Sequence, residues 1–378
     1  MSKTFTIYKP KIIKKPLINK NTLLFPIHYN DEKYNIYIDY YNLPKSISIS
    51  KTAEGIVSLF YIISLYNNLK LEVYAKTDNS LIKNLINIQS YFSSVDQNKN
   101  FVKENCKFHN ITKSRKKKFF DKRKTIVTAT GGADSTSSMI KYKKEIGACL
   151  FVLGFDIKMD KTDQEWVDIV INNTKEVMNK CLGDKIPLLV TETNLWDVLI
   201  YQIQKKYNIN CGIPNFAQGA SVAAIIYPLT NNFNKLIMSG PGVGEKYKKY
   251  MKSMYRSDME RLYSSNFFKI RVDDNLCRQD KIKYIHKKVP SALKNLRICT
   301  KWNKYGGLNC QQCQKCIQTG LICNLLGIAK DTSLKELTKD EIEKYYQDYT
   351  ALISKNGGDK YTFLRQIDDL YLIYKKRK

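Results

Sequence analysis

The chain has 378 residues, of which 43% are hydrophobic and 12% aromatic, enough apolar material for packed cores in two to three domains. This composition excludes a disordered chain. The longest apolar run, over 56–66, is well short of the ~20 residues that a membrane-spanning helix needs. No continuous apolar segment follows the basic residues near the N-terminus. We therefore expect a soluble, cytoplasmic protein without a membrane partner.

Basic residues outnumber acidic residues by 63 to 35, which gives a net charge of +28. Residues 1–124 hold 23 of the basic and 9 of the acidic residues, an excess of 14. Such a charge is typical of proteins with a polyanionic partner. Only 9 of the 63 basic residues are arginine, however, and a chain rich in Lys, Asn, Ile and Tyr is also typical of an A/T-rich genome. The charge therefore leaves a tRNA or RNA partner open.

Residues 1–120 are predicted to form an α+β domain. Alternating β-branched and aromatic residues predict strands, and apolar residues at helical spacing predict helices. The predicted strands are 25–29, 34–40 and 71–75, and the predicted helices are 52–67 and 80–92. The basic run 113–124 is interpreted as a solvated linker, with an electrostatic guide for phosphates or RNA as the alternative.

From residue 125 onward the pattern changes to strands that alternate with helices, which predicts a parallel sheet. The predicted strands are 125–129, 148–156, 186–191 and 235–238, and the predicted helices are 135–145, 164–180, 195–205 and 218–229. We expect a nucleotide-binding domain over 121–258, its continuation with a cysteine-rich insert over 259–330, and a helical tail over 331–378. A capping box from Thr338 to Glu341 marks the first helix of that tail.

The most informative segment is a glycine turn, where a β-rich run over 126–129 leads through Gly131 and Gly132 into a helix. Two glycines let the backbone approach an anion closely, and the helix that begins there directs its free amides toward the same point. Hydroxyl donors at the turn come from Thr130, Ser135 and Thr136. The turn is therefore predicted to hold phosphate without a lysine.

The string Thr130-Gly-Gly-Ala-Asp-Ser-Thr136 resembles the pyrophosphate loop of the ATP pyrophosphatases of adenine nucleotide alpha-hydrolase fold. The resemblance implies a parallel-sheet HUP or Rossmann-like domain that splits ATP between the α and β phosphates and adenylates a substrate oxygen. It implies catalytic roles for Asp134 and Ser135, and Asp134 suits Mg²⁺ held against the phosphates. The nucleotide-binding residues implied in this way are Thr130, Gly131, Gly132, Asp134, Ser135 and Thr136.

Four of the ten cysteines follow the pattern C-x10-C-x2-C-x2-C. They are Cys299, Cys310, Cys313 and Cys316. Four thiolates at this spacing can surround one tetrahedral Zn²⁺. An iron–sulfur cluster uses the same ligands and is the alternative, but four cysteines with no open position favour a structural zinc site. The other cysteines, Cys323 included, are expected to be small buried residues.

A pyrophosphate loop followed by this cysteine pattern is similar to the 7-cyano-7-deazaguanine synthase family. The resemblance covers about residues 125–330. It implies a reaction in which ATP and ammonia convert a carboxylate into a nitrile, with a structural zinc beside the active site. The Gly-Arg-Asn signature of that family is absent, and this chain has Asn215-Phe-Ala-Gln-Gly-Ala-Ser221 between the two motifs. The acceptor substrate is therefore left open.

Small or acidic residues at predicted strand ends and helix starts are further candidates for contact with the nucleotide. These candidates are Asp156, Gly219, Ser221, Ser239 and Gly240. Packing of small residues, or a solvated turn at Asp156, explains them equally well. Arg278 and Lys281 are interpreted as part of a solvated face, with contact to a phosphate or a substrate carboxylate as the alternative.

Together the motifs predict an enzyme that uses ATP and Mg²⁺ to adenylate a carboxylate or carbonyl oxygen of a small molecule or nucleobase. A nitrogen nucleophile would then form an amide or nitrile. Positioning and charge stabilisation would supply most of the catalytic power. The second hypothesis is thiolation or another modification of a tRNA base by the same adenylation. The third, from another class, is a non-catalytic zinc-containing protein that binds RNA or a nucleotide.

Overall fold

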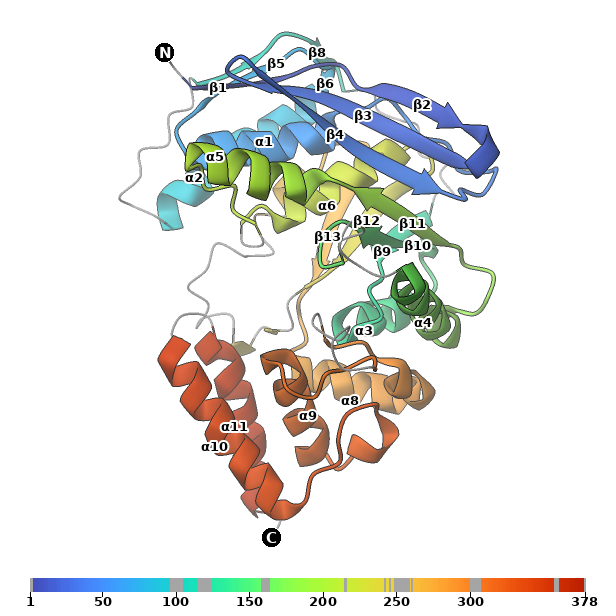
Figure 1. Ribbon diagram of the computed structural model, residues 1–378, viewed down its shortest axis with the longest axis vertical. Helices are drawn as coiled ribbons and strands as arrows, with labels where there is room; N and C mark the ends of the chain where they lie inside the picture. The colour runs from blue at the N-terminus through green and yellow to red at the C-terminus, as the bar shows by residue number, and fades with distance from the viewer. Residues whose placement is uncertain are drawn as a thin grey trace.

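One large sheet runs through the molecule and carries helices on both faces (Figure 1). The computed structural model describes residues 3–95, 105–114, 124–157, 164–213, 216–240, 243–244, 246–247, 259, 261–299, 307–356 and 360–376. The fold class is α/β, and most strand pairs of the large sheet are parallel.

The described strands follow the order β13-β12-β9-β10-β11-β4-β3-β1-β5-β7 in the large sheet, with β2 beside β3, while β6 and β8 form a separate pair. The strands are β1 (Thr4–Ile7), β2 (Lys11–Lys15), β3 (Lys20–Tyr29), β4 (Glu32–Tyr41), β5 (Lys70–Val73), β6 (Thr77–Asp78), β7 (Cys106–Phe108), β8 (Ile111–Thr112), β9 (Lys124–Thr128), β10 (Ile146–Leu153), β11 (Leu188–Thr193), β12 (Phe233–Ser239) and β13 (Lys269–Asp273).

The described α-helices are α1 (Glu54–Tyr66), α2 (Asn79–Val95), α3 (Ala133–Lys141), α4 (Gln164–Leu182), α5 (Lys205–Tyr207), α6 (Gln218–Ile226), α8 (Arg278–Lys288), α9 (Gln314–Leu325), α10 (Lys339–Asn356) and α11 (Lys360–Lys376). The segments predicted over 52–67, 80–92, 135–145, 164–180 and 218–229 are helical, as α1, α2, α3, α4 and α6, whereas α8 is absent from the sequence prediction. The predicted helix over 195–205 is π-helical for most of its length, at η4 (Asp197–Gln204). The capping box is confirmed, because the Thr338 backbone amide donates to Glu341 and the Glu341 amide donates to the Thr338 hydroxyl.

Five parallel strands carry the glycine turn, and the predicted parallel sheet is confirmed. Numbered in chain order among themselves, they lie 5-4-1-2-3 across the sheet, so the winding reverses between β9 and β12. At such a switch point neighbouring connections leave toward opposite faces, which opens a crevice at the carboxyl ends of the strands. The fifth strand, β13, is absent from the sequence prediction.

The N-terminal strands continue this sheet. β4 pairs with β11 in antiparallel register from Val190↔Tyr41 to Thr193↔Ile38. Figure 1 shows the N-terminal strands curving over α1 and α6. A separate N-terminal domain over 1–120 stays a prediction, but most of its described strands belong to the large sheet, and only β6 and β8 pair apart from it. Most of the predicted basic linker, residues 115–123, lies outside the described residues.

Two large apolar cores cover the two faces of the parallel strands. One core joins the N-terminal strands, α1 and α6 to one face, and the other joins α3, α8 and the C-terminal helices to the opposite face. The backbones of the alanine-rich α6 and of α1 are in direct contact. A Cβ atom added at Gly55 would lie 2.4 Å from the Ala223 carbonyl oxygen. Small residues on α6 are therefore required for packing.

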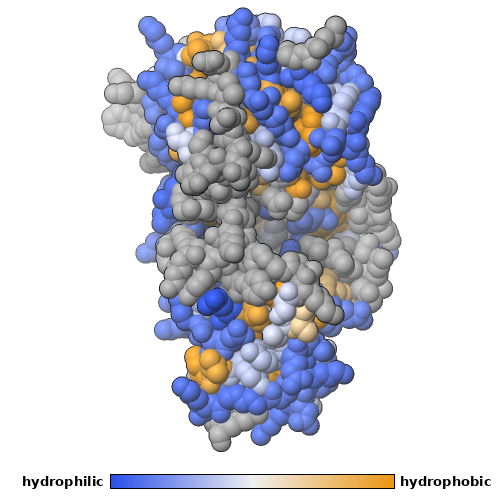
Figure 2. Space-filling view, turned by 90° about the vertical axis from the view of Figure 1, so that its left-hand side faces the viewer, coloured by the Kyte–Doolittle hydropathy of each residue, from blue (hydrophilic) through white to orange (hydrophobic). Residues whose placement is uncertain are grey.

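Figure 2 shows hydrophilic residues over most of the described surface of one side, with hydrophobic residues in small patches. Among the helices of the described residues, none combines the length and apolar character needed to cross a bilayer.

Candidate functional site

A cavity of about 240 Å³ opens at the carboxyl ends of β9, β10 and β12. This is the place where the winding of the parallel strands reverses, the usual position of ligands in such sheets. Its polar wall is formed by Thr130, Asp134, Ser135, Asp156, Ser239 and Arg297. Its apolar wall is formed by Phe155, Trp196, Val222 and Met238, among others. Pockets that combine an apolar wall with a few convergent polar groups are typical of small-molecule sites.

The glycine turn between β9 and α3 is held in a tight, specific shape. Gly131 has a φ of 71°, in the left-handed region that favours glycine. The backbone amide of Thr130 donates to Ser135 Oγ over 3.2 Å, and this hydroxyl donates to the Gly132 carbonyl over 3.1 Å. The Thr136 hydroxyl also donates to the Gly132 carbonyl, over 2.8 Å. The hydroxyl groups of Ser135 and Thr136 therefore stabilise the conformation of the turn.

Only some of the residues predicted to bind the nucleotide at this turn line the cavity. Thr130 is exposed and Gly132 half-buried, whereas Gly131 and Thr136 are buried. A Cβ at Gly131 would lie 3.2 Å from Thr174 Oγ1, so α4 covers this glycine. The structure places Thr130, Asp134 and Ser135 along the cavity, whereas Gly131 and Thr136 support them from behind.

Asp134 binds two cations. Its Oδ2 lies 2.6 Å from Arg278 Nη2 and its Oδ1 lies 3.0 Å from Lys281 Nζ, which also donates to the Gly240 carbonyl over 2.9 Å. Although burial alone would raise the pKa of Asp134, these cations lower it below its ordinary value. The interpretation of Arg278 and Lys281 as a solvated face is wrong, because their side chains are only 13% and 1% exposed.

These contacts bear on the predicted Mg²⁺ site. Each oxygen of Asp134 already contacts a side-chain cation, so a Mg²⁺ ion at this carboxylate would share it with Arg278 and Lys281. The residues present therefore fit a site in which side-chain cations compensate negative charge better than one in which Asp134 holds a metal.

Arg297 is a cavity residue that the sequence analysis missed. Its side chain is buried, and its Nε and Nη2 donate to the Thr130 carbonyl over 3.3 and 3.2 Å. Burial lowers the pKa of Arg297, and the nearby Asp156 counteracts this effect. The sequence contains one signal for this residue. Most basic residues of the chain are lysine, yet the residue two positions before Cys299 is arginine. Arginine offers planar, forked donors that lysine lacks.

The remaining predicted residues divide into two groups. Asp156 and Ser239 line the cavity, and Ser239 Oγ has no hydrogen-bond partner among the described residues. Gly219 and Ser221 are buried in α6 and are absent from the cavity wall, where Gln218 and Val222 of the same helix lie instead. Gly240 packs against Asp274 and contributes its carbonyl to Lys281, likewise outside the wall.

Phe155 and Trp196 stack at one side of the cavity, with ring centroids 4.4 Å apart and an interplanar angle of 16°. The pair presents a broad, rigid apolar surface opposite the polar turn. Aromatic surfaces of this kind favour planar ring ligands, because offset stacking adds to the burial of apolar area. The cavity thus combines a polar wall at the glycine turn with an aromatic surface.

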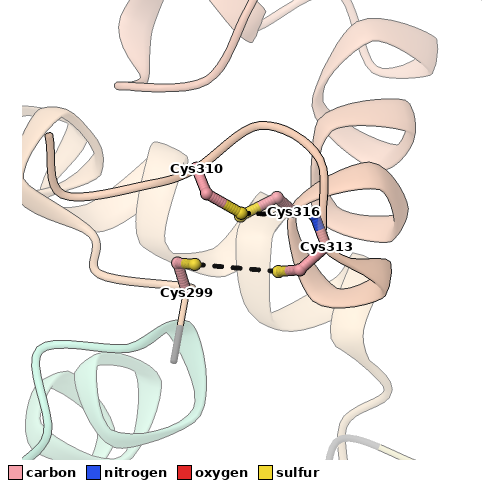
Figure 3. Close-up of side chains that lie close together, drawn as sticks. All are labelled: Cys299, Cys310, Cys313 and Cys316. Atoms are coloured by element: carbon pink, nitrogen blue, oxygen red, sulfur yellow. Dashed lines mark hydrogen bonds between the residues drawn. The ribbon is translucent and has the colours of Figure 1, made fainter. Parts of the chain in front are cut away.

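The four cysteines of the predicted metal site lie together, as Figure 3 shows. Their sulfur atoms are all within 4.8 Å of one another, with 3.7 Å between Cys299 and Cys313 and 3.9 Å between Cys310 and Cys316. Cys316 belongs to α9, Cys313 directly precedes it, and the other two lie in loops. The Cys313 backbone amide donates to Cys310 Sγ over 3.2 Å. The cluster could hold a metal ion.

The thiols of the cluster interact with one another. Burial alone would raise the pKa of the Cys310 thiol, but backbone amides and neighbouring thiols lower it to about 7, whereas burial and the neighbouring cysteines raise the pKa of Cys316. Cys323, by contrast, is fully buried in the core and burial raises its pKa to about 12, as expected for a small apolar residue.

No known protein-family model, curated protein or solved structure matches this chain. The geometry of the cavity and of the cysteine cluster therefore carries the functional argument.

Proposed function

We propose that the cavity binds ATP and that the protein adenylates an oxygen of a small-molecule or nucleobase substrate. The observation that carries the proposal is the position of the glycine turn: it lines a cavity at the switch point of the parallel strands, opposite a stacked aromatic pair. The strand arrangement supports assignment to a HUP or Rossmann-like, pyrophosphate-loop fold.

In this proposal the phosphates lie against Thr130, Ser135 and the start of α3, and the base lies against the aromatic wall. Arg278 and Lys281 stand behind Asp134 and can move toward pyrophosphate as negative charge develops on it. A substrate oxygen attacks the α-phosphorus, the bond to the β-phosphate oxygen breaks, and pyrophosphate leaves. A nitrogen nucleophile then displaces AMP to give an amide or, after loss of water, a nitrile. Mg²⁺ would accompany the nucleotide phosphates.

The cysteine cluster supports a structural zinc. A tetrahedral ion with Zn–S bonds of 2.3 Å places the sulfur atoms about 3.8 Å apart, close to the 3.7 and 3.9 Å observed. An iron–sulfur cluster separates its thiolates more widely, because each thiolate binds a different corner or iron. We therefore propose one zinc ion held by the four cysteines.

Amide or nitrile formation is favoured over thiolation of a tRNA base. Sulfur insertion would need reactive cysteines beside the nucleotide, and among the described residues no cysteine lines the cavity. Cys211, which lies in a loop, is buried, donates to the Leu199 carbonyl and has its pKa raised by burial to about 12.

The proposal is tested by titrating the protein with ATP in a calorimeter and by screening ATP–pyrophosphate exchange against carboxylates, deazapurines and tRNA. Ser239→Ala removes an unpaired hydroxyl from the cavity wall and should weaken ATP binding about 3- to 10-fold. Ser137→Ala is the matched control, because this hydroxyl is also unpaired among the described residues but lies outside the wall. Absence of ATP binding, or equal loss in both variants, contradicts the proposal.

A further inference from the structure

Arg297 forms hydrogen bonds to the glycine turn through both its backbone amide and its side chain. Its backbone amide donates to the Gly131 carbonyl over 2.8 Å, and its guanidinium donates twice to the Thr130 carbonyl. These two carbonyls belong to the residues that give the turn its shape. The conformation of the turn is therefore tied to the position of residue 297.

The same side chain reaches toward the cysteine cluster. Arg297 Nη1 donates to the carbonyl of Cys299 over 3.3 Å. The amides of Ile298 and Cys299 donate to Asn309 Oδ1 over 2.7 and 3.1 Å, and Asn309 directly precedes Cys310. Two members of the cluster are thus connected, through residues 297–299, to the turn that lines the cavity.

A buried guanidinium is costly unless its donors are satisfied, and an apolar side chain of similar length would be tolerated more easily. Arg297 is only 7% exposed, and no ion pair within 4.0 Å is recorded for it among the described residues. Its donors instead bind two carbonyl oxygens that belong to different functional segments, at Thr130 and Cys299. A planar, forked group is well suited to bind two carbonyls at once.

We propose that Arg297 couples the two sites, so that a metal ion in the cysteine cluster determines how well the glycine turn is ordered. A bound ion joins Cys299 to the other three cysteines and fixes its carbonyl. Arg297 is then fixed between that carbonyl and the carbonyl of Thr130. Without the ion, residues 298 and 299 are held only by their hydrogen bonds to Asn309 and to Arg297 itself, and the turn loosens. Arg297 is a positioning residue, and its effect on ATP binding rests on the proposed function.

The coupling is tested without nucleotide by hydrogen–deuterium exchange of a peptide covering residues 129–139. Removal of the metal with a chelator should speed exchange in this peptide by about 3- to 10-fold. Arg297→Met, with metal content verified by mass spectrometry, should exchange as fast as the metal-free wild type and should gain nothing further on metal removal. Arg297→Lys keeps the charge but cannot span both carbonyls, so it should behave in the same way.

Arg271→Met is the control, because Arg271 is exposed on β13 and lies over the Tyr142 ring, away from the cluster. It should retain the full response to the metal. Exchange over 129–139 that is independent of the metal overturns the coupling, as does a normal response in both Arg297 variants. The proposed function fails separately: a metal-dependent turn in a protein that binds no ATP leaves the coupling intact, and metal-independent ATP binding removes the coupling alone.

Discussion

The carboxylate of Asp134 and the ammonium of Lys281 form an ion pair, 3.0 Å between Oδ1 and Nζ, in which the lysine side chain is almost completely buried. Removing one partner of such a pair leaves an uncompensated buried charge, which typically costs about 3–5 kcal/mol. Because Asp134 is partly exposed, we expect a value of about 3 kcal/mol for Asp134→Ala.

The measurement is urea unfolding at neutral pH. The double variant Asp134→Ala/Lys281→Met should recover much of the loss, since it buries no unpaired cation. Asp184→Asn, at an exposed position, serves as the control. The folded-state pKa of Asp134 is lowered, so its stabilisation is present above the unfolded pKa and is lost as the pH falls through the folded pKa. A single variant as stable as the wild type contradicts this account.

The cysteine cluster predicts one metal ion per chain, most simply zinc, measured by mass spectrometry of the purified protein. Cys313→Ser removes one ligand of the cluster and should lower the metal content and the melting temperature, the latter by about 3 °C for a loss of about 2 kcal/mol. Cys323→Ser is the control for a cysteine of the same helix region that is not in the cluster. It should keep the metal, whatever its effect on core packing. Metal-free protein with an unchanged melting temperature rules the site out.

Gly131→Ala should impair both stability and ATP binding. An alanine in the left-handed region costs about 1–2 kcal/mol, and the new Cβ would press on Thr174. Gly183 also has a positive φ, of 89°, but open space where a Cβ would be. Gly183→Ala should therefore lose stability through backbone strain alone and bind ATP normally. Urea unfolding and calorimetric titration of both variants check this, and normal ATP binding by Gly131→Ala would show that the turn does not shape the site.

Glu54 gives the protein a pH-dependent stability. It lies at the start of α1, it is 8% exposed, and its Oε2 has no hydrogen-bond partner among the described residues. Burial, with a smaller effect from Asp78, raises the pKa of Glu54 to about 7. An acid whose folded pKa lies above its unfolded value loses stability as the pH rises from the unfolded pKa to the folded one, here by about 3 kcal/mol.

Glu54→Gln should therefore match the wild type near pH 4 and exceed its stability by about 3 kcal/mol near pH 8. Urea unfolding across this range measures the difference. Glu336→Gln, at an exposed site, should show no pH-dependent difference from the wild type. A constant offset between wild type and Glu54→Gln at all pH values would mean that Glu54 stays charged in the folded protein.

Local patterns in the sequence predicted four of the five parallel strands, most of the long helices and the cysteine cluster. β10 is recognisable because both of its faces are buried, so nearly every residue is apolar. The four cysteines are recognisable because short fixed spacings bring three of them to one end of a helix. The shape of the glycine turn follows from neighbouring residues such as Gly132 and Ser135, whose contacts are local.

Contacts between distant residues were not predictable in this way. Arg278 and Lys281 looked like a solvated face because their partner, Asp134, lies 144 and 147 positions away. Arg297 is 167 positions from Thr130. Gly219 and Ser221 are buried in α6, a helix whose Ala223 and Ala224 backbone meets Gly55 of the distant helix α1. The pairing of β4 with β11 has no local signal either, since either edge could accept another strand.

Because of that pairing, the first third of the chain covers the edge strand β11 of the parallel strands. A shortened protein that begins at residue 121 would expose the backbone groups of β11 that now bind β4, together with the apolar side of α6 that lies against α1. Open strand edges of this kind recruit further chains, so the shortened protein should precipitate on expression. Co-expression with residues 1–120 as a separate polypeptide should restore solubility.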